Sequence, residues 1–577
     1  MAKISLTIDG KKITVNKGTT VLEAAKQAGI YIPTLCYYEG LPPQSECRLC
    51  IVEVEGMRGL PASCTLPAQD GMVVNTRSKR VIDARKFILQ LLLCSHPADC
   101  KTCEKHGRCE FQSLLYEYGM RDYKYEMRDK RHFIDKSSPA IERDLDKCIL
   151  CGRCVRVCRD IQTVGVYSFA KRGLNSVVTT AYDKPISETP CVSCGQCTIV
   201  CPTGAISERE SINEVWNALH SGKHVICQIA PSVRVSIGEM FGLPPGRIVT
   251  GKTVAALRRL GFHKVFDTNF GADLTIMEEA HELAEKVEKG LPLLSSSCCP
   301  AWIDFIEHFY PDLLSYLSTC KSPMQMFGAI AKTYYAEKNS LKPEDIVLVS
   351  IMPCTAKKFE AARPEMCASG VRDVDFVLTT REAARMMMEV GIHLPSLKPE
   401  PFDEPLGIST GAAALFGATG GVTEAALRTA YEIATGKELK QLDFKQVRGF
   451  EFVRQATVDF DGRKVKVAIA NTLGGARKIL EELRAGNWAY DFVEVMACRG
   501  GCIGGGGQPI PPRELRLKVI KERAKAIYRV DRSLPIRKSH ENPAIKKLYE
   551  EFLVKPLGEK SMKLLHTTYT PKKGYGL

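Results

Sequence analysis

The positions of its cysteines constrain this chain more than any other feature of the sequence. Nineteen of the 24 cysteines, together with one histidine, fall into five groups of four ligands each. Groups of four ligands with short internal spacings hold iron–sulfur clusters or structural metal ions. So many reduced thiols also argue against an oxidising compartment, where they would form disulfides. We therefore expect a metal-rich protein of the cytoplasm.

Two cysteine runs with the same spacing lie in the middle of the chain. The first is Cys148-x2-Cys151-x2-Cys154-x3-Cys158, and the second is Cys191-x2-Cys194-x2-Cys197-x3-Cys201. Bacterial two-cluster ferredoxins have this arrangement, and the fourth cysteine of each run ligates the [4Fe–4S] cluster of the other run. A structural zinc site would need only four ligands, usually as two separated Cys-x2-Cys pairs. We therefore predict a two-[4Fe–4S] ferredoxin-like domain over residues 139–209.

The first 80 residues predict a different electron carrier. Apolar and polar residues alternate over 4–8 and again over 13–15, on either side of an Asp9-Gly10 turn, which predicts a hairpin. A helix with Thr20 as its N-cap follows, and then a strand at 51–55. The cysteines of this part are Cys36, Cys47, Cys50 and Cys64. The combination resembles a β-grasp [2Fe–2S] ferredoxin, although its first two cysteines are further apart than in the plant type.

A fourth group lies between these two parts, in residues 81–138. It consists of His96, Cys100, Cys103 and Cys109, behind an apolar helical run from Val81 to Leu93. Three cysteines cannot complete the ligands of a [4Fe–4S] cluster, and imidazole is an accepted iron ligand. We expect His96 to be the fourth ligand, and Cys94 is the competing candidate.

Charge and hydropathy exclude other classes of protein. The formal net charge is +14, but 19 thiolates bound to iron make the loaded protein less basic than its sequence. Residues 511–577 carry 17 Lys and Arg against 7 Asp and Glu. We interpret them as a solvated tail covering the last domain, with helical segments at 545–552, in preference to a surface that attracts an acidic redox partner. No apolar run is long enough to span a membrane. Aromatic residues are not interspersed among the basic residues in the way that would indicate nucleic-acid binding.

From residue 210 onward, predicted strands and helices alternate. This pattern is typical of an α/β domain with mixed sheets flanked by helices, which we expect over 210–577, preceded by the α+β ferredoxin-like domains. The expected strands are 225–229, 264–267, 291–294, 346–351, 376–378, 465–469 and 492–495, and the expected helices include 253–260, 276–287, 382–390 and 476–483.

The last group of cysteines follows the ends of these strands. Cys299 comes after one strand, Cys354 after another, and Cys498 and Cys502 after a third. Since α/β sheets place their sites beyond the carboxyl ends of the strands, we expect the four thiols to meet around one cluster. The glycines at 500–501 and 504–507 leave room for the backbone to approach something larger than a [4Fe–4S] cubane.

Three segments resemble the signatures of the [FeFe]-hydrogenases. They are Ser296-Ser-Cys-Cys-Pro300, Met352-Pro-Cys-Thr-Ala-Lys-Lys358 and Glu494-Val-Met-Ala-Cys-Arg-Gly-Gly-Cys502. The resemblance extends over essentially the whole chain, including the order of the N-terminal cluster groups. It implies the iron hydrogenase fold and an H-cluster, in which a [4Fe–4S] cubane is joined through one cysteine to a diiron unit with CO, CN⁻ and azadithiolate ligands. Cys502 matches the bridging cysteine, and Cys299, Cys354 and Cys498 match the other cubane ligands.

The resemblance also implies which residues surround the diiron unit. Lys357 matches a lysine that binds one cyanide, and Ala230-Pro231-Ser232 matches a turn that contacts the other. Met352 and Met496 match residues that pack against the unit. A buried anionic ligand needs hydrogen-bond donors of this kind, because leaving it unpaired in an apolar site is costly.

A buried centre that handles protons needs a relay of titratable groups. By resemblance, Cys298 exchanges protons with the cofactor, and Glu279, Ser318 and Glu282 continue the relay towards Lys286, where the family has arginine. Ala301, Met324 and Val495 depart from the family pattern without loss of a ligand.

These features predict a hydrogenase that interconverts H2 with protons and electrons. The accessory clusters, one [2Fe–2S] and three [4Fe–4S], would relay electrons to ferredoxin. The alternative is the catalytic subunit of a multimeric NAD(P)-linked or electron-bifurcating hydrogenase. The chain has no GxGxxG fingerprint, so nicotinamide chemistry would require a flavin- and NAD(P)-binding partner subunit. More remote alternatives are a non-catalytic relative that assembles or senses iron–sulfur clusters and an iron–sulfur subunit of respiratory complex I.

Overall fold

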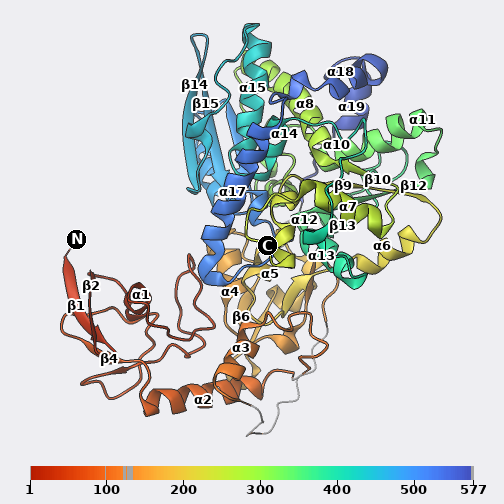
Figure 1. Cartoon of the computed structure of the whole chain (residues 1–577). Helices are drawn as coiled ribbons and strands as arrows, with labels where there is room; N and C mark the ends of the chain where they lie inside the picture. Colours follow the sequence, from red (N-terminus) through yellow and green to blue (C-terminus); the bar gives the residue numbers. More distant parts are fainter. Residues whose placement is uncertain (1, 98, 121–124, 126–133, 573–577) are drawn as a thin grey trace.

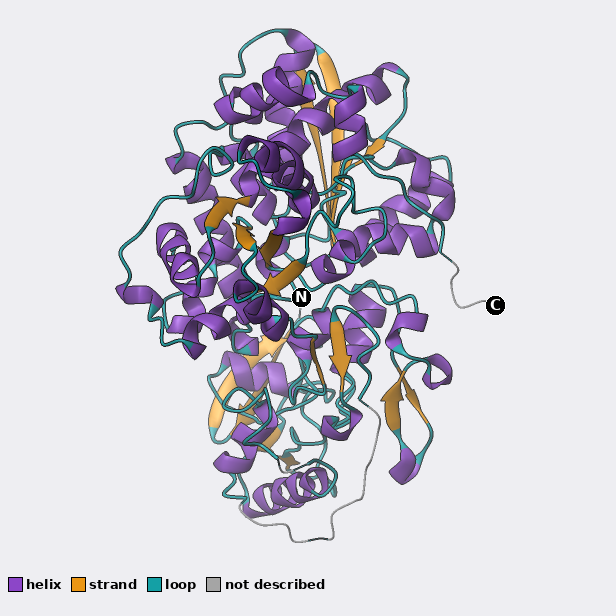
Figure 2. Ribbon diagram, turned by 90° about the vertical axis from the view of Figure 1, so that its right-hand side faces the viewer, coloured by secondary structure: helices purple, strands orange, loops and turns teal. Residues whose placement is uncertain are grey.

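The computed structural model describes residues 2–97, 99–120, 125 and 134–572. The iron–sulfur part of the chain lies below the larger α/β part in Figure 1, where the first is red to orange and the second yellow to blue. Figure 2 shows that helices surround the strands of the α/β part.

The N-terminal part forms a small sheet, as its alternating pattern predicts. β1 (Lys3–Ile8) and β2 (Lys11–Asn16) make the expected hairpin, and α1 (Val21–Gln27) begins after Thr20, whose side chain accepts from the Glu23 amide in a capping box. The sheet order is β2-β1-β4-β3. The strand expected over 51–55 is shorter in the structure and forms β3 (Glu53–Val54). Strand β4 (Val73–Asn75) was not predicted, because it has only three residues.

The linking region and the ferredoxin-like region contain short elements between cluster loops. The helices are α2 (Lys79–Leu93), α3 (Glu110–Glu117), α4 (Arg153–Arg156) and α5 (Gln196–Val200). The antiparallel strand pairs are β5 (Ile141–Arg143) with β8 (Ile206–Glu208), and β6 (Ser168–Ala170) with β7 (Val177–Thr179).

The α/β part contains two four-stranded sheets. The first sheet is parallel, in the order β10 (Lys264–Asp267), β9 (His224–Ile229), β12 (Ile346–Met352) and β13 (Phe376–Thr379). The second has the order β11 (Leu293–Leu294), β16 (Phe492–Met496), β15 (Arg463–Asn471) and β14 (Val453–Phe460), of which only β14 is antiparallel to its neighbour. Strands β12 and β16 are buried along their length, which explains why they are continuous apolar runs in the sequence.

All seven strands expected in this part are present, and an eighth was missed. β14 alternates between buried and exposed residues and carries polar side chains such as Arg454 and Gln455. Such an edge strand is less apolar than the inner strands, and its position is set by pairing with β15.

Helices cover both sheets. They are α6 (Ile212–Leu219), α7 (Thr250–Leu260), α8 (Thr268–Glu288), α9 (Pro300–Phe309), α10 (Pro323–Ile330), α12 (Ala356–Ala361), α13 (Thr380–Glu389), α14 (Gly411–Ala414), α15 (Gly421–Thr435) and α16 (Leu473–Arg484). Within the described residues, no helix combines the length and the apolar character that crossing a bilayer would require.

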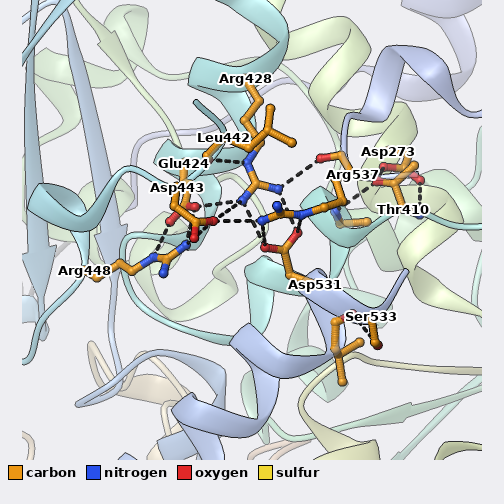
Figure 3. A network of polar contacts seen from close by, with 12 residues as sticks. Asp273, Thr410, Glu424, Arg428, Leu442, Asp443, Arg448, Asp531, Ser533 and Arg537 are labelled. Carbon is orange, nitrogen blue, oxygen red and sulfur yellow. Dashed lines mark hydrogen bonds and ion pairs between the residues drawn. The ribbon is translucent and has the colours of Figure 1, made fainter. Parts of the chain in front are cut away.

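The C-terminal segment is an integral part of the fold, so the expectation of a solvated tail was wrong. It forms α17 (Arg516–Ser533), α18 (Pro543–Leu548) and α19 (Glu559–Leu565). Its Arg523 is 2% exposed and pairs with Glu239, while its Asp531 joins a buried network with Arg537 of the same segment and with Arg428 and Glu424 of α15 (Figure 3). Arg428 and Asp531 are both fully buried. Charged side chains can be buried when they pair with groups of opposite charge. The amino-acid composition does not reveal such pairs.

Candidate functional site

The predicted cysteines meet in one cavity between the two sheets. Cys354 follows β12 of the first sheet, whereas Cys299 follows β11 and Cys498 follows β16 of the second. Together with Cys502 they line the same cavity. The site therefore lies beyond the carboxyl ends of the strands, as expected, and these strands belong to two different sheets.

The cavity suits a group that carries several metal ions. Burial raises the pKa of the Cys354 thiol to about 12 and also raises the pKa values of Cys299, Cys498 and Cys502. The negative charges of neighbouring cysteines add to this effect at Cys354, Cys498 and Cys502. Four clustered thiols of this kind ionise together only when cations neutralise them, which is what bound iron does.

Every residue predicted to surround the diiron unit lines this cavity. They are Ala230, Pro231, Ser232, Met352, Lys357 and Met496, joined by Cys298. Sequence reasoning missed Thr268 and Phe416, which also line the cavity. Neither residue belongs to a cysteine motif, so no local signal pointed to them.

Polar groups in the cavity wall fit a bound anionic ligand. The hydroxyls of Ser232 and Thr268 are buried and have no hydrogen-bond partner in the described part of the chain. Burial opposes the charge of Lys357, but the Glu360 carboxylate, 2.7 Å from its Nζ, raises the pKa of Lys357. A cation and two unpaired hydroxyls in an otherwise apolar cavity match a group with polar ligands at its periphery.

The glycines after Cys502 also allow close packing within the protein. Gly501 and Gly505 do line the cavity, but a Cβ atom at Gly505 would lie 2.3 Å from the Pro353 carbonyl oxygen. A Cβ atom at Gly506 would lie 2.7 Å from the carbonyl oxygen of Cys194. These glycines mainly allow backbone to approach backbone, and Gly506 brings the Cys502 loop against the ferredoxin-like region.

Of the predicted proton-relay residues, Cys298 lines the cavity, and Glu279 is a charge neighbour of Cys298. Glu279 and Glu282 are on α8, and the Ser318 hydroxyl donates to Glu282 at 2.6 Å. Glu279 is 1% exposed, and neither of its carboxylate oxygens has a partner with good hydrogen-bond geometry in the described part of the chain. Burial raises the pKa of Glu279 to about 8. Burial likewise raises the pKa of Cys298, so both groups can hold a proton near neutrality.

At the predicted exit of the relay, Lys286 is held by backbone carbonyl groups. The Lys286 ammonium donates to the carbonyl oxygens of Tyr316 and Leu317, at 3.0 Å and 3.1 Å. Glu282 contacts the Thr319 amide at 3.0 Å instead, and also the Thr319 hydroxyl. Lys286 is therefore near the relay but is anchored to the backbone.

The structure gathers the cysteines of each accessory group. Cys36, Cys47, Cys50 and Cys64 contact one another closely enough to perturb each other's titration. One cavity is lined by His96, Cys100, Cys103 and Cys109, and another by Cys148, Cys151, Cys154 and Cys201. Cys158 is a charge neighbour of Cys191, Cys194 and Cys197. The Cys94 thiol points elsewhere and donates to the Tyr125 carbonyl at 3.5 Å.

Buried side chains connect these groups to each other and to the central cavity. Arg156, fully buried, donates to the carbonyl oxygens of Cys36 at 2.6 Å and Cys151 at 3.2 Å. At the other end, the Gln196 amide lies 3.2 Å from the Cys498 sulfur. The N-terminal group, the ferredoxin-like region and the central cavity are thus joined in series.

Comparison with protein families assigns the same parts. Residues 223–506 match the family described as "Iron only hydrogenase large subunit, C-terminal domain", and 517–572 match "Iron hydrogenase small subunit". Residues 1–79 match a 2Fe-2S iron-sulfur cluster binding domain, 85–124 the NADH-ubiquinone oxidoreductase-G iron-sulfur binding region, and 147–205 a 4Fe-4S dicluster domain.

Individual relatives agree with these families. The chain is 50% identical to the NADP-reducing hydrogenase subunit HndD of Solidesulfovibrio fructosivorans over 99% of both chains. It is 41% identical to iron hydrogenase 1 of Clostridium pasteurianum, over 98% of this chain and 99% of that one. A solved structure of a variant of [FeFe]-hydrogenase HydA1 from Chlamydomonas reinhardtii matches with 42% identity and a TM-score of 0.56, covering 63% of this chain and all of that one. The chain belongs to the iron-only, or [FeFe], hydrogenases and has their iron–sulfur domains.

Proposed function

We propose that the central cavity holds an H-cluster and that the chain interconverts H2 with protons and electrons there. Cys299, Cys354, Cys498 and Cys502 would ligate the cubane, with Cys502 bridging to the diiron unit. When bound, this group supplies the metal site at which H2 is split or formed. The observation that carries the proposal is the convergence of four thiols from three strand ends on a cavity that also contains Lys357 and the unpaired Ser232 hydroxyl.

The wall residues would orient the diiron unit. The Lys357 ammonium and the donors of the Ala230–Ser232 turn suit its cyanide ligands, because charged or polar donors stabilise a buried anion. Met352 and Met496 fill the remaining surface and exclude water. Met324, one of the departures from the family pattern, lines the cavity too and adds a flexible apolar side chain there.

Cys298 would carry protons between the bound group and the relay. Its thiol lines the cavity, and burial keeps the thiol protonated, so that Sγ can donate a proton and recover one from Glu279. Glu279 would regain its proton from Glu282 through the Ser318 hydroxyl, which lies 2.6 Å from Glu282, and the steps would run in the opposite order when H2 is oxidised.

The accessory groups would hold one [2Fe–2S] and three [4Fe–4S] clusters. His96 would complete the group of Cys100, Cys103 and Cys109. We also propose domain boundaries at residues 80, 138 and 209, and a cytoplasmic location consistent with so many reduced thiols. Electrons would pass from the centre through the ferredoxin-like region to the N-terminal part, along the series joined by Gln196 and Arg156.

The electron acceptor would be ferredoxin or a flavin- and NAD(P)-binding partner subunit. The full-length similarity to a relative named as a subunit of an NADP-reducing hydrogenase favours the second. Because the chain itself has no dinucleotide fingerprint, a partner must bind the nicotinamide. Co-purification of a flavoprotein subunit, and H2-dependent reduction of NADP⁺ only in its presence, would support this choice. Reduction of ferredoxin by the chain alone, with no flavoprotein captured, would contradict it.

The variant C298S tests the catalytic proposal. The chain is matured anaerobically with the diiron cofactor, and H2 oxidation is measured with a viologen dye. We expect turnover to fall by at least about 10²-fold, because the relay loses its first titratable group. Infrared bands of metal-bound CO and CN⁻ should remain. The matched control C367S replaces an exposed cysteine outside the cavity and should behave as wild type. Normal turnover of C298S would exclude this relay.

A further inference from the structure

Three potential metal ligands meet beside the relay, outside the cysteine groups. Glu282 comes from α8, Cys320 precedes α10, and His566 follows α19. One ligand atom from each lies within 4.8 Å of the other two. The residues are 9%, 0% and 7% exposed. We propose that Glu282, Cys320 and His566 form a binding site for a divalent cation of the zinc type.

The distances between the ligand atoms suit such an ion. Cys320 Sγ lies 3.7 Å from Glu282 Oε2, and His566 Nδ1 lies 3.7 Å from Glu282 Oε1. A tetrahedral Zn²⁺ with bonds of about 2.3 Å to sulfur and 2.0 Å to nitrogen or oxygen separates its ligand atoms by about 3.3–3.5 Å. All three ligand atoms lie within 4.8 Å of one another, so the widest separation must shorten by up to about 1.5 Å for the ligands to close around the ion.

The backbone holds two of the ligands face to face. Cys320 and His566 pair across a short antiparallel bridge. The Lys321 amide donates to the Leu565 carbonyl at 2.7 Å, and the Thr567 amide donates to the Thr319 carbonyl at 2.8 Å. A site on backbone that is fixed in this way loses little freedom when an ion binds.

The second nitrogen of His566 has the partner that metal-binding histidines usually have. His566 Nε2 lies 3.2 Å from a carboxylate oxygen of Glu278. Glu278 is itself held by the Tyr549 hydroxyl at 2.5 Å and by the Leu557 amide at 2.7 Å. A carboxylate at this position fixes the ring and directs the other nitrogen towards the metal. Here that nitrogen, Nδ1, is on the side of Glu282 and bonds the Thr319 hydroxyl at 2.7 Å, a contact that the ion would replace.

The charge of the site also favours a cation. Neither Glu278 nor Glu282 forms an ion pair with a lysine or arginine in the described part of the chain, and the basic side chain paired with each of them is His566. Lys286, further along α8, is held by backbone carbonyls. Binding of Zn²⁺ would release the Cys320 proton to solvent, so thiolate and carboxylate together would balance the two positive charges. A mixed sulfur, nitrogen and oxygen set suits zinc better than magnesium or calcium, which prefer oxygen ligands.

Occupation of this site would block proton transfer, a consequence that rests on the proposed relay. Glu282 accepts from Ser318, the preceding member of the relay. A carboxylate bound to a metal ion is no longer available as a proton acceptor. The cation would therefore act as a reversible inhibitor of the holoenzyme without touching the H-cluster.

The test adds ZnCl2 to the cluster-loaded holoenzyme under anaerobic conditions. We expect X-ray absorption to show about one sulfur at 2.3 Å and several nitrogen or oxygen ligands at about 2.0 Å around the zinc. Turnover should fall at least tenfold and recover when EDTA is added. The variant C320A should weaken both zinc binding and inhibition at least tenfold, whereas the control C367A, which removes an exposed thiol, should change neither.

The outcomes separate the site from the relay. Zinc surrounded by four sulfurs, or unchanged binding to C320A, would overturn the site. Mixed coordination without inhibition would support the site and contradict the role of Glu282 in the relay. If C320A lost iron, E278Q would replace it as the decisive variant, because loss of the carboxylate behind a metal-bound histidine lowers affinity by about 10–100-fold. Unchanged zinc affinity in E278Q would then overturn the proposal.

Discussion

Replacing Glu279 by glutamine should increase stability while removing activity. The carboxyl group is buried between the cavity and Ser318, and burial raises its pKa from the ordinary 4.5 to about 8. Glutamine has nearly the same shape but cannot accept or release a proton. If Glu279 is part of the relay, turnover of E279Q should fall by about 10²–10⁴-fold.

The stability effect follows from proton linkage. Between pH 4.5 and 8 the unfolded chain releases the Glu279 proton while the folded chain keeps it. The free energy of unfolding therefore falls as the pH rises through this window, by about 1.4 kcal/mol per unit. From pH 5.5 to pH 8 the loss is about 3 kcal/mol, and E279Q avoids it. The unfolding entropy of an α/β domain of this size is roughly 0.8 kcal/mol/K. The difference in Tm between E279Q and wild type should therefore be about 4 °C larger at pH 8 than at pH 5.5.

The assay is thermal unfolding of wild type and E279Q at pH 5.5 and pH 8, paired with H2 oxidation at the same two pH values. Only the difference between the two proteins is interpreted, since other groups titrate in both. An equal Tm difference at the two pH values would refute the assignment of a protonated, buried Glu279. Retained turnover of E279Q would refute its place in the relay.

Two further predictions concern packing. D531A should lower the Tm by about 4–6 °C, because removing one partner of a buried ion pair costs about 3–5 kcal/mol. The control D461A removes one partner of an exposed ion pair and should change the Tm by about 1 °C or less. Equal shifts would show that the C-terminal network is not buried in solution. G506A should slow dye reduction more than H2/D2O exchange, because the added methyl group meets the Cys194 carbonyl and separates the centre from the ferredoxin-like region. The control G59A, where a Cβ meets open space, should affect neither rate, and a similar loss in both variants would contradict this reasoning.

The sequence predicted the parts of the site that depend on local pattern. The spacing of the cysteine groups and their positions after buried strands were enough to expect that Cys299, Cys354 and Cys498 would meet. The inner strands were also recognisable, because strands buried on both faces are continuously apolar. Strand β14 was missed because an exposed edge weakens that signal.

Features that depend on contacts between distant segments could not be predicted. Nothing local in the sequence pairs Cys320 with His566, which meet across a single bridge between separate elements. The same holds for the buried ion pairs of the C-terminal segment, since its Asp531 pairs with Arg428 only after α15 and α17 pack together. The glycines near Cys502 were recognised as special, but the backbone that they approach belongs to another part of the chain.

The contact of Gly506 with Cys194 limits how this architecture can be divided. Two loops that meet main chain to main chain have no side chains to trim or exchange, so they must change together or not at all. The ferredoxin-like region packs against the Cys502 loop through main-chain contacts. A shortened enzyme that lacked this region would need another segment to cover the glycines of that loop.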